Sequence, residues 1–225
     1  MKNTRLDYEG QIDDIIQKLI ESTRDMVEPA STSIVKKYGR DPFLVLVSCI
    51  LSLRTKDTVS LPASIRLFEV AKTPKAMLGL SHKKIETIIY PTGFYRQKAK
   101  NLLEISKILL DKFDGLTPSN EKDLLELPGV GRKTANLVLS VGFGVPAICV
   151  DTHVHRISNR LGLVDTKTPD QTEIALKKIL PEKYWLVYNN LLVRWGQNIC
   201  VPISPFCSKC AISHLCPKIG VKKSR

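Results

Sequence analysis

Leu127-Pro128-Gly129-Val130-Gly131-Arg132-Lys133-Thr134-Ala135 is the most informative stretch of this 225-residue sequence. A short predicted helix, Lys122–Leu127, ends at the proline, and a second predicted helix begins at about Arg132. Between them, two glycines flank one apolar residue. Glycine adopts positive φ at no steric cost, so both glycines are expected to permit a tight turn. We expect Val130 to pack in the core between the two helices.

This hairpin predicts a binding site for phosphate. Backbone N–H groups beside a helix N-terminus bind phosphate oxygens without preference for a base. The alternative is a corner between two helices that binds nothing. Lys133 falls in the first turn of the second helix, where the helix dipole and Arg132 both favour a neutral amine. A nucleophile requires such an amine, but Lys133 could equally contact phosphate as a cation.

A second segment, Val150-Asp151-Thr152-His153, follows an apolar run and opens another predicted helix. An isolated Asp in this position most often caps the helix. The functional alternative is a carboxylate aimed into a cleft near Lys133. The chain between Lys133 and Asp151 is long enough for one helix, one turn and a return.

A third segment, Thr92–Lys98, places two aromatic and two cationic residues after Pro91. An exposed aromatic side chain on such a loop can insert between bases. Burial is the more frequent outcome for a pair such as Phe94 and Tyr95.

Four cysteines near the C-terminus predict a metal site. Their pattern is Cys200-x6-Cys207-x2-Cys210-x5-Cys216. Four thiolates suit tetrahedral zinc or an iron–sulfur cluster. Structural zinc sites usually present two Cys-x2-Cys pairs, and only one is present, so we favour the cluster. Exposed thiolates require a reducing compartment.

The composition limits the possible classes of protein. Lys and Arg number 34 against 22 Asp and Glu, which gives a formal charge of +12 and favours a nucleic acid partner over a merely basic protein. No apolar run reaches the roughly 20 residues of a membrane span. Residues 1–7 have no apolar core, so we expect no secretory signal.

Helical periodicity recurs along the whole chain, and no segment alternates like a strand. Apolar residues at helical spacing predict one helix around residues 12–20 and another over Tyr95–Lys112. About ten helices are expected, so the fold class is all-α. We expect the basic tail, Lys218–Arg225, to fray.

Taken in this order, Leu127–Ala135, Val150–Arg156 and the closing cysteine pattern resemble endonuclease III, a family of helix–hairpin–helix DNA glycosylases. The resemblance extends from about Asp41 to Pro217. It implies two helical domains flanking a DNA-binding cleft. Residues 35–145 would form a six-helix barrel with the hairpin, and residues 1–34 with 146–225 would hold a 4Fe–4S cluster on the four cysteines.

The resemblance also implies an activity. Lys133 corresponds to the family's Schiff-base nucleophile and Asp151 to its catalytic carboxylate. The chain would be a monomeric glycosylase and AP lyase acting on double-stranded DNA with oxidised pyrimidines or abasic sites. Its compartment would be the cytoplasm (nucleoid) of a prokaryote, or otherwise a nucleus or organelle. The alternative is a non-catalytic DNA-binding protein with a structural metal site.

The implied DNA contacts are in the hairpin and in two other loops; they are Gly129, Val130, Gly131, Arg132, Thr134, Arg54 and Phe94. Two of these depart from the family pattern. Arg54 stands where the family often has Gln, and Phe94 stands where an aliphatic residue is common. The loop between the first two cysteines, Val201–Phe206, is usually basic in the family and has no cation here.

Overall fold

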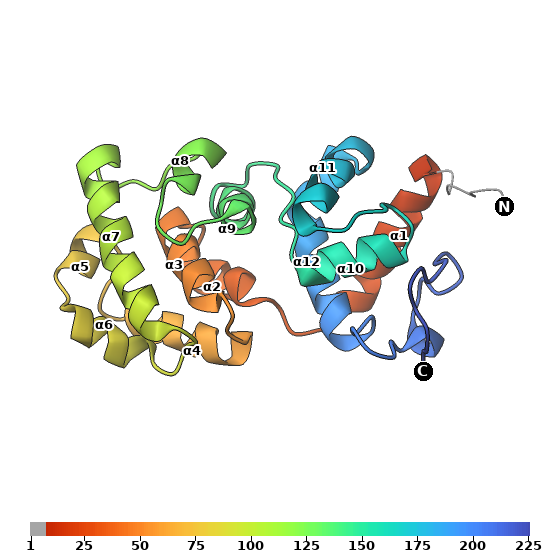
Figure 1. Ribbon diagram of the computed structural model, residues 1–225, viewed down its shortest axis with the longest axis horizontal. Coiled ribbons are helices and arrows are strands. Elements are labelled where there is room, and N and C mark those ends of the chain that lie inside the picture. The colour runs from red at the N-terminus through yellow and green to blue at the C-terminus, as the bar shows by residue number, and fades with distance from the viewer. Residues whose placement is uncertain (1–7) are drawn as a thin grey trace. The chain divides into compact units, whose positions relative to one another are not determined.

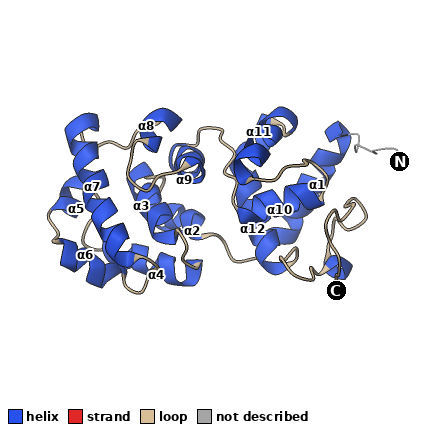
Figure 2. Ribbon diagram, in the orientation of Figure 1, coloured by secondary structure: helices blue, strands red, loops and turns tan. Residues whose placement is uncertain are grey.

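The computed structural model describes residues 8–225. Helices and loops make up this part of the chain, and it contains no strand (Figure 2), so the predicted all-α class is confirmed. The chain divides into two compact units (Figure 1). We call Pro29–Ala147 the hairpin unit, and the residues up to Glu28 together with Ile148–Arg225 the cysteine unit. The predicted absence of a secretory signal concerns residues outside the described part.

The hairpin unit contains six helices followed by the hairpin itself. The six are α2 (Ala30–Tyr38), α3 (Pro42–Ser52), α4 (Asp57–Phe68), α5 (Pro74–Leu78), α6 (His82–Ile89) and α7 (Tyr95–Phe113). The hairpin helices are α8 (Glu121–Leu125) and α9 (Arg132–Leu137), and α9 continues as a π-helix over Val138–Phe143.

Helix α3 forms the centre of the hairpin unit. All nine residues of Phe43–Leu51 are buried, and α2, α4, α7 and α9 contact the helix. A helix that is apolar on every side is stable only when it is surrounded in this way. Its start is fixed by Asp41, whose Oδ1 accepts hydrogen bonds from the N–H groups of Phe43 at 2.9 Å and Leu44 at 3.1 Å.

The boundary between the units differs from the predicted one. Helix α2 crosses the predicted boundary at residues 34 and 35, and Ile34 is fully buried in the core of the hairpin unit. The hairpin unit therefore begins at Pro29. A short helix with one buried face belongs wholly to the core that buries it. A domain boundary predicted from the sequence pattern does not take this into account.

The cysteine unit joins segments from both ends of the chain. Its helices are α1 (Tyr8–Thr23), α10 (Thr152–Arg160), α11 (Pro169–Ile179) and α12 (Trp185–Asn198). The apolar face of α1 packs against α12, and Trp195 and Tyr188 of α12 are fully buried in the shared core. Beyond α12 the chain contains only one 3-10 turn, Cys207–Lys209. No helix of the described residues is long and apolar enough to cross a membrane.

The prediction that Lys218–Arg225 frays is wrong. The N–H of Arg225 donates to the carbonyl of Pro205 at 2.8 Å, and the N–H of Ser208 donates to the carbonyl of Arg225 at 2.9 Å. The Arg225 guanidinium lies 3.9 Å from the centroid of the Phe206 ring. These contacts attach the tail to the loop between the first two cysteines, which is the loop that has no cation of its own.

Candidate functional site

The hairpin turn depends on one of its two glycines. The N–H of Val130 donates to the carbonyl of Leu127 at 3.0 Å and closes the turn. Gly129 has a φ of +80°, and a Cβ there would lie 2.5 Å from Nδ2 of Asn101. Positive φ was predicted for Gly131 as well, and this is wrong, because its φ is −104° and its backbone is extended.

Gly131 instead places no side chain over the start of α9. It is the exposed N-cap of α9, and a Cβ on it would meet nothing within 4 Å. The first-turn N–H groups of a helix have no acceptor within that helix. A glycine cap has no side chain to accept their hydrogen bonds. The turn therefore combines a sterically required glycine with a glycine cap that has no side chain.

The hairpin side chains divide into buried and exposed groups. Val130 is buried in the core of the hairpin unit, as predicted, and Thr134 is buried as well. Only the backbone of these two residues is available to a ligand. Arg132 is half-buried, with Nη1 3.6 Å from Oε1 of Glu121 on α8. Sequence reasoning missed this carboxylate, which offsets part of the Arg132 charge.

Lys133 is exposed in the first turn of α9, on the side of α3 that carries Cys49. Burial raises the pKa of the Cys49 thiol to about 12, and the nearby positive charge of Lys133 acts in the opposite direction. Asp57 of α4 lies close enough to raise that pKa further. The side chain of the predicted nucleophile is therefore exposed, and its charge is close enough to act on a buried thiol.

Arg54 and Phe94 stand at the tips of two neighbouring loops of the hairpin unit. Both are exposed, and both have left-handed backbones, with φ of +50° and +56°. The Arg54 guanidinium lies 5.6 Å from the centroid of the Phe94 ring. Burial was the more common expectation for Phe94, but its side chain is 63% exposed.

Asp151 caps α10 in the cysteine unit. Its Oδ1 accepts hydrogen bonds from the N–H groups of His153 and Val154, each at 2.9 Å. Its other oxygen, Oδ2, accepts none from the part of the chain that the structure describes. The capping role expected from the sequence is present, and one carboxylate oxygen remains for another partner.

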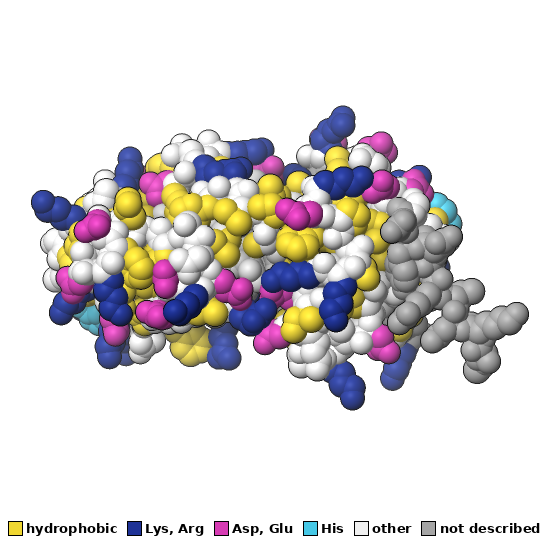
Figure 3. All heavy atoms as spheres, turned by 90° about the horizontal axis from the view of Figure 1, so that it is seen from above, with side chains coloured by type: hydrophobic (Ala, Val, Ile, Leu, Met, Phe, Trp, Pro, Cys, Tyr) yellow, Lys and Arg dark blue, Asp and Glu magenta, His cyan; other side chains and the backbone are white. Residues whose placement is uncertain are grey.

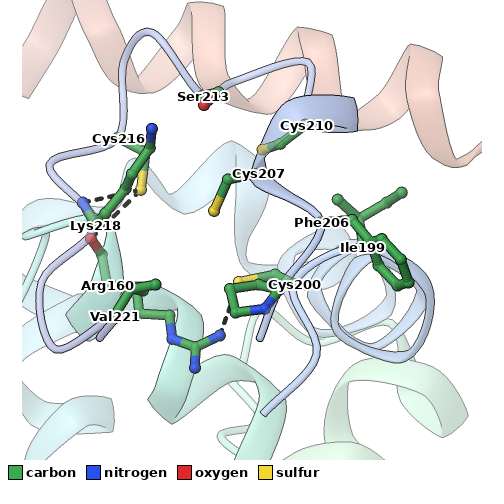
Figure 4. A pocket seen from close by; sticks show the side chains of 11 residues that line it. Arg160, Ile199, Cys200, Phe206, Cys207, Cys210, Ser213, Cys216, Lys218 and Val221 are labelled. Carbon is green, nitrogen blue, oxygen red and sulfur yellow. Dashed lines mark hydrogen bonds between the residues drawn. The ribbon is translucent and has the colours of Figure 1, made fainter. Parts of the chain in front are cut away.

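The four C-terminal cysteines line one pocket of the cysteine unit, with about 330 Å³ of empty space that is partly open to solvent. Figure 4 shows their sulfur atoms facing this space, between the end of α10 and the loop after α12. Burial raises the pKa values of the Cys210 and Cys216 thiols. By contrast, Cys49 and Cys149 are buried, as predicted.

Donors around this pocket point at sulfur. Nη1 of Arg160 donates to Sγ of Cys200 at 3.3 Å, and the N–H of Lys218 donates to Sγ of Cys216 at 3.4 Å. Hydrogen bonds to sulfur accompany iron–sulfur clusters held by four thiolates. No three Cys, His, Asp or Glu side chains among residues 8–225 are grouped as a site for one metal ion. The thiols and their donors fit a cluster.

Comparison with known proteins identifies the family. A model of the HhH-GPD superfamily, described as base excision DNA repair proteins, matches residues 47–182. Endonuclease III of Thermotoga maritima is 49% identical over 196 residues, which are 85% of this chain and 92% of that protein. The chain belongs to the endonuclease III family. The resemblance inferred from the three motifs is therefore confirmed.

Other endonuclease III proteins support the same assignment. The chloroplastic endonuclease III homolog 1 of Arabidopsis thaliana is 46% identical over 184 residues, 78% of this chain and 48% of that protein. A solved structure of a trapped covalent intermediate of endonuclease III with DNA, an estranged-adenine complex, has a TM-score of 0.80 at 35% identity. The match covers 93% of this chain and 95% of the chain in that structure.

Membership in the endonuclease III family identifies the chain as a base excision repair enzyme, a DNA glycosylase and AP lyase that binds DNA.

One residue that supports its loops was overlooked in the sequence. Lys98 shares a helical face with Leu102, Ile105 and Leu109, all of which are buried. A lysine in the register of a buried apolar stripe is the signal that could have found it.

Proposed function

We propose that this endonuclease III family enzyme removes oxidised pyrimidines from double-stranded DNA and cuts the strand at the resulting abasic site. The observation that carries the proposal is Lys133. It is an exposed amine in the first turn of α9, directly after the Gly-Val-Gly turn. A lyase needs an amine that can reach a sugar carbon, and the hairpin offers one next to a phosphate-binding turn.

The hairpin would hold the DNA backbone. The first turn of α9 has a glycine cap without a side chain, so a phosphate oxygen could approach its N–H groups, which would bind it without reading the bases. The side chains of Val130 and Thr134 face the core, so Gly129, Val130, Gly131 and Thr134 would contribute backbone groups. Arg132 would contribute its half-exposed guanidinium.

The chemistry would take place on a nucleotide rotated out of the duplex, because C1′ cannot be attacked within the stack. The lone pair of Lys133 Nζ forms a bond to C1′ as the bond from C1′ to the base breaks. The base leaves with the electron pair of the broken glycosidic bond and gains a proton, and the lysine nitrogen loses a proton. Opening of the sugar ring gives a Schiff base. Loss of a C2′ proton then breaks the C3′–O bond and cuts the strand on the 3′ side.

Asp151 would stabilise the positive charge that develops on the sugar as the base leaves. The support is its free Oδ2, because Oδ1 is occupied by the N–H groups of His153 and Val154. Hydrogen bonds from two amides also hold the carboxyl group in one orientation. An oriented charge costs no reorganisation when the reaction occurs.

Arg54 and Phe94 would fill the space that the rotated nucleotide leaves. The exposed ring of Phe94 can insert between base pairs, and a guanidinium can donate to an orphan guanine. Their cation–π contact supports joint insertion. Arg54 in place of Gln would change the preference for the opposite base.

A 4Fe–4S cluster would be held by Cys200, Cys207, Cys210 and Cys216. When bound, it supplies a covalent tie for a segment that has no α-helix of its own. Four thiolates around a core of charge +2 lower the formal charge of the chain from +12 to about +10, which remains strongly basic. We propose no role for the cluster in the steps at C1′.

The partner would be double-stranded DNA with damaged pyrimidines or abasic sites, bound by a monomer. The enzyme would work wherever that DNA is kept: the cytoplasm with its nucleoid in a prokaryote, or otherwise a nucleus or organelle.

Borohydride trapping on a duplex with one abasic site tests the proposal. Reduction of the Schiff base should leave the wild-type protein covalently attached to DNA, and Lys133→Ala should leave none. Lys122→Ala, which removes an exposed lysine of the other hairpin helix, α8, is the matched control and should trap normally. Equal trapping by Lys133→Ala would remove this lysine from the reaction, and no trapping by the wild type would favour a non-catalytic DNA-binding protein.

Iron and acid-labile sulfide analysis tests the cofactor. About four of each per chain are expected, and substitution of any of the four cysteines by Ser should lower both. Cys149→Ser is the control, because this buried cysteine does not line the pocket and its substitution should leave the iron content unchanged. One zinc per chain without sulfide would exclude the cluster.

A further inference from the structure

Lys98 of α7 is a buried cation with three partners. Its side chain is almost wholly inaccessible, with the residue 4% exposed. Nζ donates to the carbonyls of Leu51 and Leu53, each at 2.7 Å, and to Oγ1 of Thr55 at 2.9 Å. A lysine ammonium has three N–H donors, so all of them are used. A buried charge is tolerated only when it is satisfied in this way.

Thr55 extends this network to the second loop. Its Oγ1 also accepts a hydrogen bond from the N–H of Gly93 at 3.1 Å and donates to the carbonyl of Leu53 at 3.2 Å. The two loops touch at the same point, where a Cβ on Gly93 would lie 2.9 Å from the carbonyl oxygen of Arg54. Lys98 and Thr55 therefore join the loop that follows α3 to the loop that precedes α7.

The tips of these two loops are Arg54 and Phe94. Both have left-handed backbones, which residues other than glycine keep only where their surroundings impose them. The Lys98 network lies directly beneath them. Its acceptors Leu53 and Thr55 flank Arg54 in the sequence. Phe94 is the N-cap of α7, four residues before Lys98. The N–H of Lys98 donates to the carbonyl of Phe94 at 3.0 Å.

We propose that Lys98 is a positioning residue, whose ammonium holds the two loops so that Arg54 and Phe94 meet DNA as one preassembled unit. This inference rests on the proposed insertion of that pair. The neighbours of Lys98 on the same helical face are apolar, so core packing alone would be served by an apolar side chain. The charge is explained by the two carbonyls and the hydroxyl group of the loops.

The positioning has a direct kinetic consequence. A pair held in its inserting geometry before it meets DNA does not have to be ordered while the base rotates. Lys98→Met keeps the length of the side chain and removes its donors, which leaves the carbonyls of Leu51 and Leu53 without their partner. Base removal should then slow by roughly tenfold to a hundredfold, the scale on which misplaced groups act.

The test measures single-turnover base removal from a duplex that contains one thymine glycol. Four proteins are compared: wild type, Lys98→Met, the double variant Arg54→Ala/Phe94→Ala, and the triple variant that combines them. If Lys98 acts through the pair, the triple variant is no slower than the double variant. Lys107→Met, which removes an exposed lysine elsewhere on α7, is the matched control and should match the wild type.

Thr55 provides a second pair of variants, in case Lys98→Met fails to fold. Thr55→Ser retains the hydroxyl group and should act like the wild type, whereas Thr55→Val removes it at similar volume and should act like Lys98→Met. A purely structural role would lower the melting temperature without this dependence on the hydroxyl group or on Arg54 and Phe94.

The outcomes separate the two ideas. A double variant with the wild-type rate would show that Arg54 and Phe94 are not used, and the proposed insertion would fall together with the inference. A slow double variant with a still slower triple variant would keep the insertion and overturn the positioning role of Lys98. Equal rates for Thr55→Ser and Thr55→Val would overturn it too.

Discussion

At the scale of single residues, the carboxyl group of Asp151 has two roles, one structural and one that we propose to be catalytic. Oδ1 caps α10, and we assign Oδ2 to the sugar. Asn caps helices about as well as Asp, whereas Ala lacks the acceptor. Asp151→Asn should therefore keep the free energy of unfolding of the wild type, and Asp151→Ala should lose about 1 kcal/mol. Both variants should lose most of the rate of base removal, because neither provides a negative charge.

Urea unfolding and single-turnover kinetics check this prediction, with DNA affinity measured in parallel. Loss of affinity at an unchanged rate constant would show that Asp151 only binds DNA. An Asp151→Asn protein as unstable as Asp151→Ala would mean that the cap requires the charge.

Lys98 makes the stability of the protein depend on pH. Burial lowers the pKa of Lys98 to about 8, and an unfolded chain restores the ordinary value of about 10.4. Between these values, the unfolded chain binds a proton that the folded protein has released, so stability rises with pH. Relative to Lys98→Met, the free energy of unfolding of the wild type should rise by about 1.4 kcal/mol per pH unit in this window.

Urea unfolding of both proteins at several pH values from 7 to about 10 measures the difference. Below pH 8 both states keep the proton, so the difference should be constant there. A difference that stays flat above pH 8, or falls, would mean that the three acceptors hold the proton on Lys98 in spite of its burial.

Local sequence patterns predicted the roles of single residues well, but they did not predict the long-range contacts. The cap at Asp151 and the burial of Val130 and Cys149 follow from their immediate neighbours in the sequence. The contacts of Lys98 join residues more than forty positions apart, and only its register on α7 hints at them. The ion pair of Arg132 with Glu121 depends on how the hairpin folds back, so it was also missed.

At the scale of elements, the two glycines of the hairpin should respond differently to the same substitution. Gly129→Ala puts a Cβ at positive φ and against Asn101, so it should cost more than about 1 kcal/mol of stability. Gly131→Ala has an ordinary backbone and open space for its Cβ, so its stability should stay within about 0.5 kcal/mol of the wild type. The same Cβ would stand where a phosphate approaches the N–H groups.

Gly131→Ala should therefore bind DNA more weakly while melting at the wild-type temperature. Thermal unfolding and fluorescence anisotropy with a labelled duplex make the comparison. Wild-type affinity in this variant would argue that the first turn of α9 does not meet the backbone of DNA.

Helices were predictable from periodicity because each one buries a face, and the buried face repeats at helical spacing. The predicted helix around residues 12–20 matches α1, in which Ile12, Ile15, Ile16 and Leu19 are buried. The tail after Lys218 has no such repeat, and its order comes from contacts of Arg225 with a distant loop. Composition alone therefore gave the wrong expectation for it.

At the scale of the whole molecule, the question is how a charge of +12 serves DNA binding. On the face drawn in Figure 3, Lys and Arg side chains alternate with Asp and Glu, and no single basic patch covers it. The net charge therefore does not reveal how many cations meet phosphate. Salt dependence does, because each phosphate neutralised by a Lys or Arg releases counterions.

The hairpin separates neutral from charged contacts in such an experiment. Each cationic contact adds about 0.9 to the fall of log K with log salt, whereas a backbone N–H adds nothing. Gly131→Ala should therefore give a line parallel to that of the wild type but displaced to weaker binding. Arg132→Ala should give a shallower line, by less than about 0.9, because Glu121 already offsets part of the Arg132 charge.

Binding to an undamaged duplex over roughly 50–200 mM salt measures these slopes without catalysis. Lys107→Met, which we expect to lie away from the DNA, should reproduce the slope of the wild type. If Gly131→Ala changed the slope, the turn would be acting by arranging cations rather than through its own N–H groups. If Arg132→Ala left the slope unchanged, Arg132 would be bound to Glu121 in the complex as it is in the free protein, and the charges that meet the phosphates would belong to other residues.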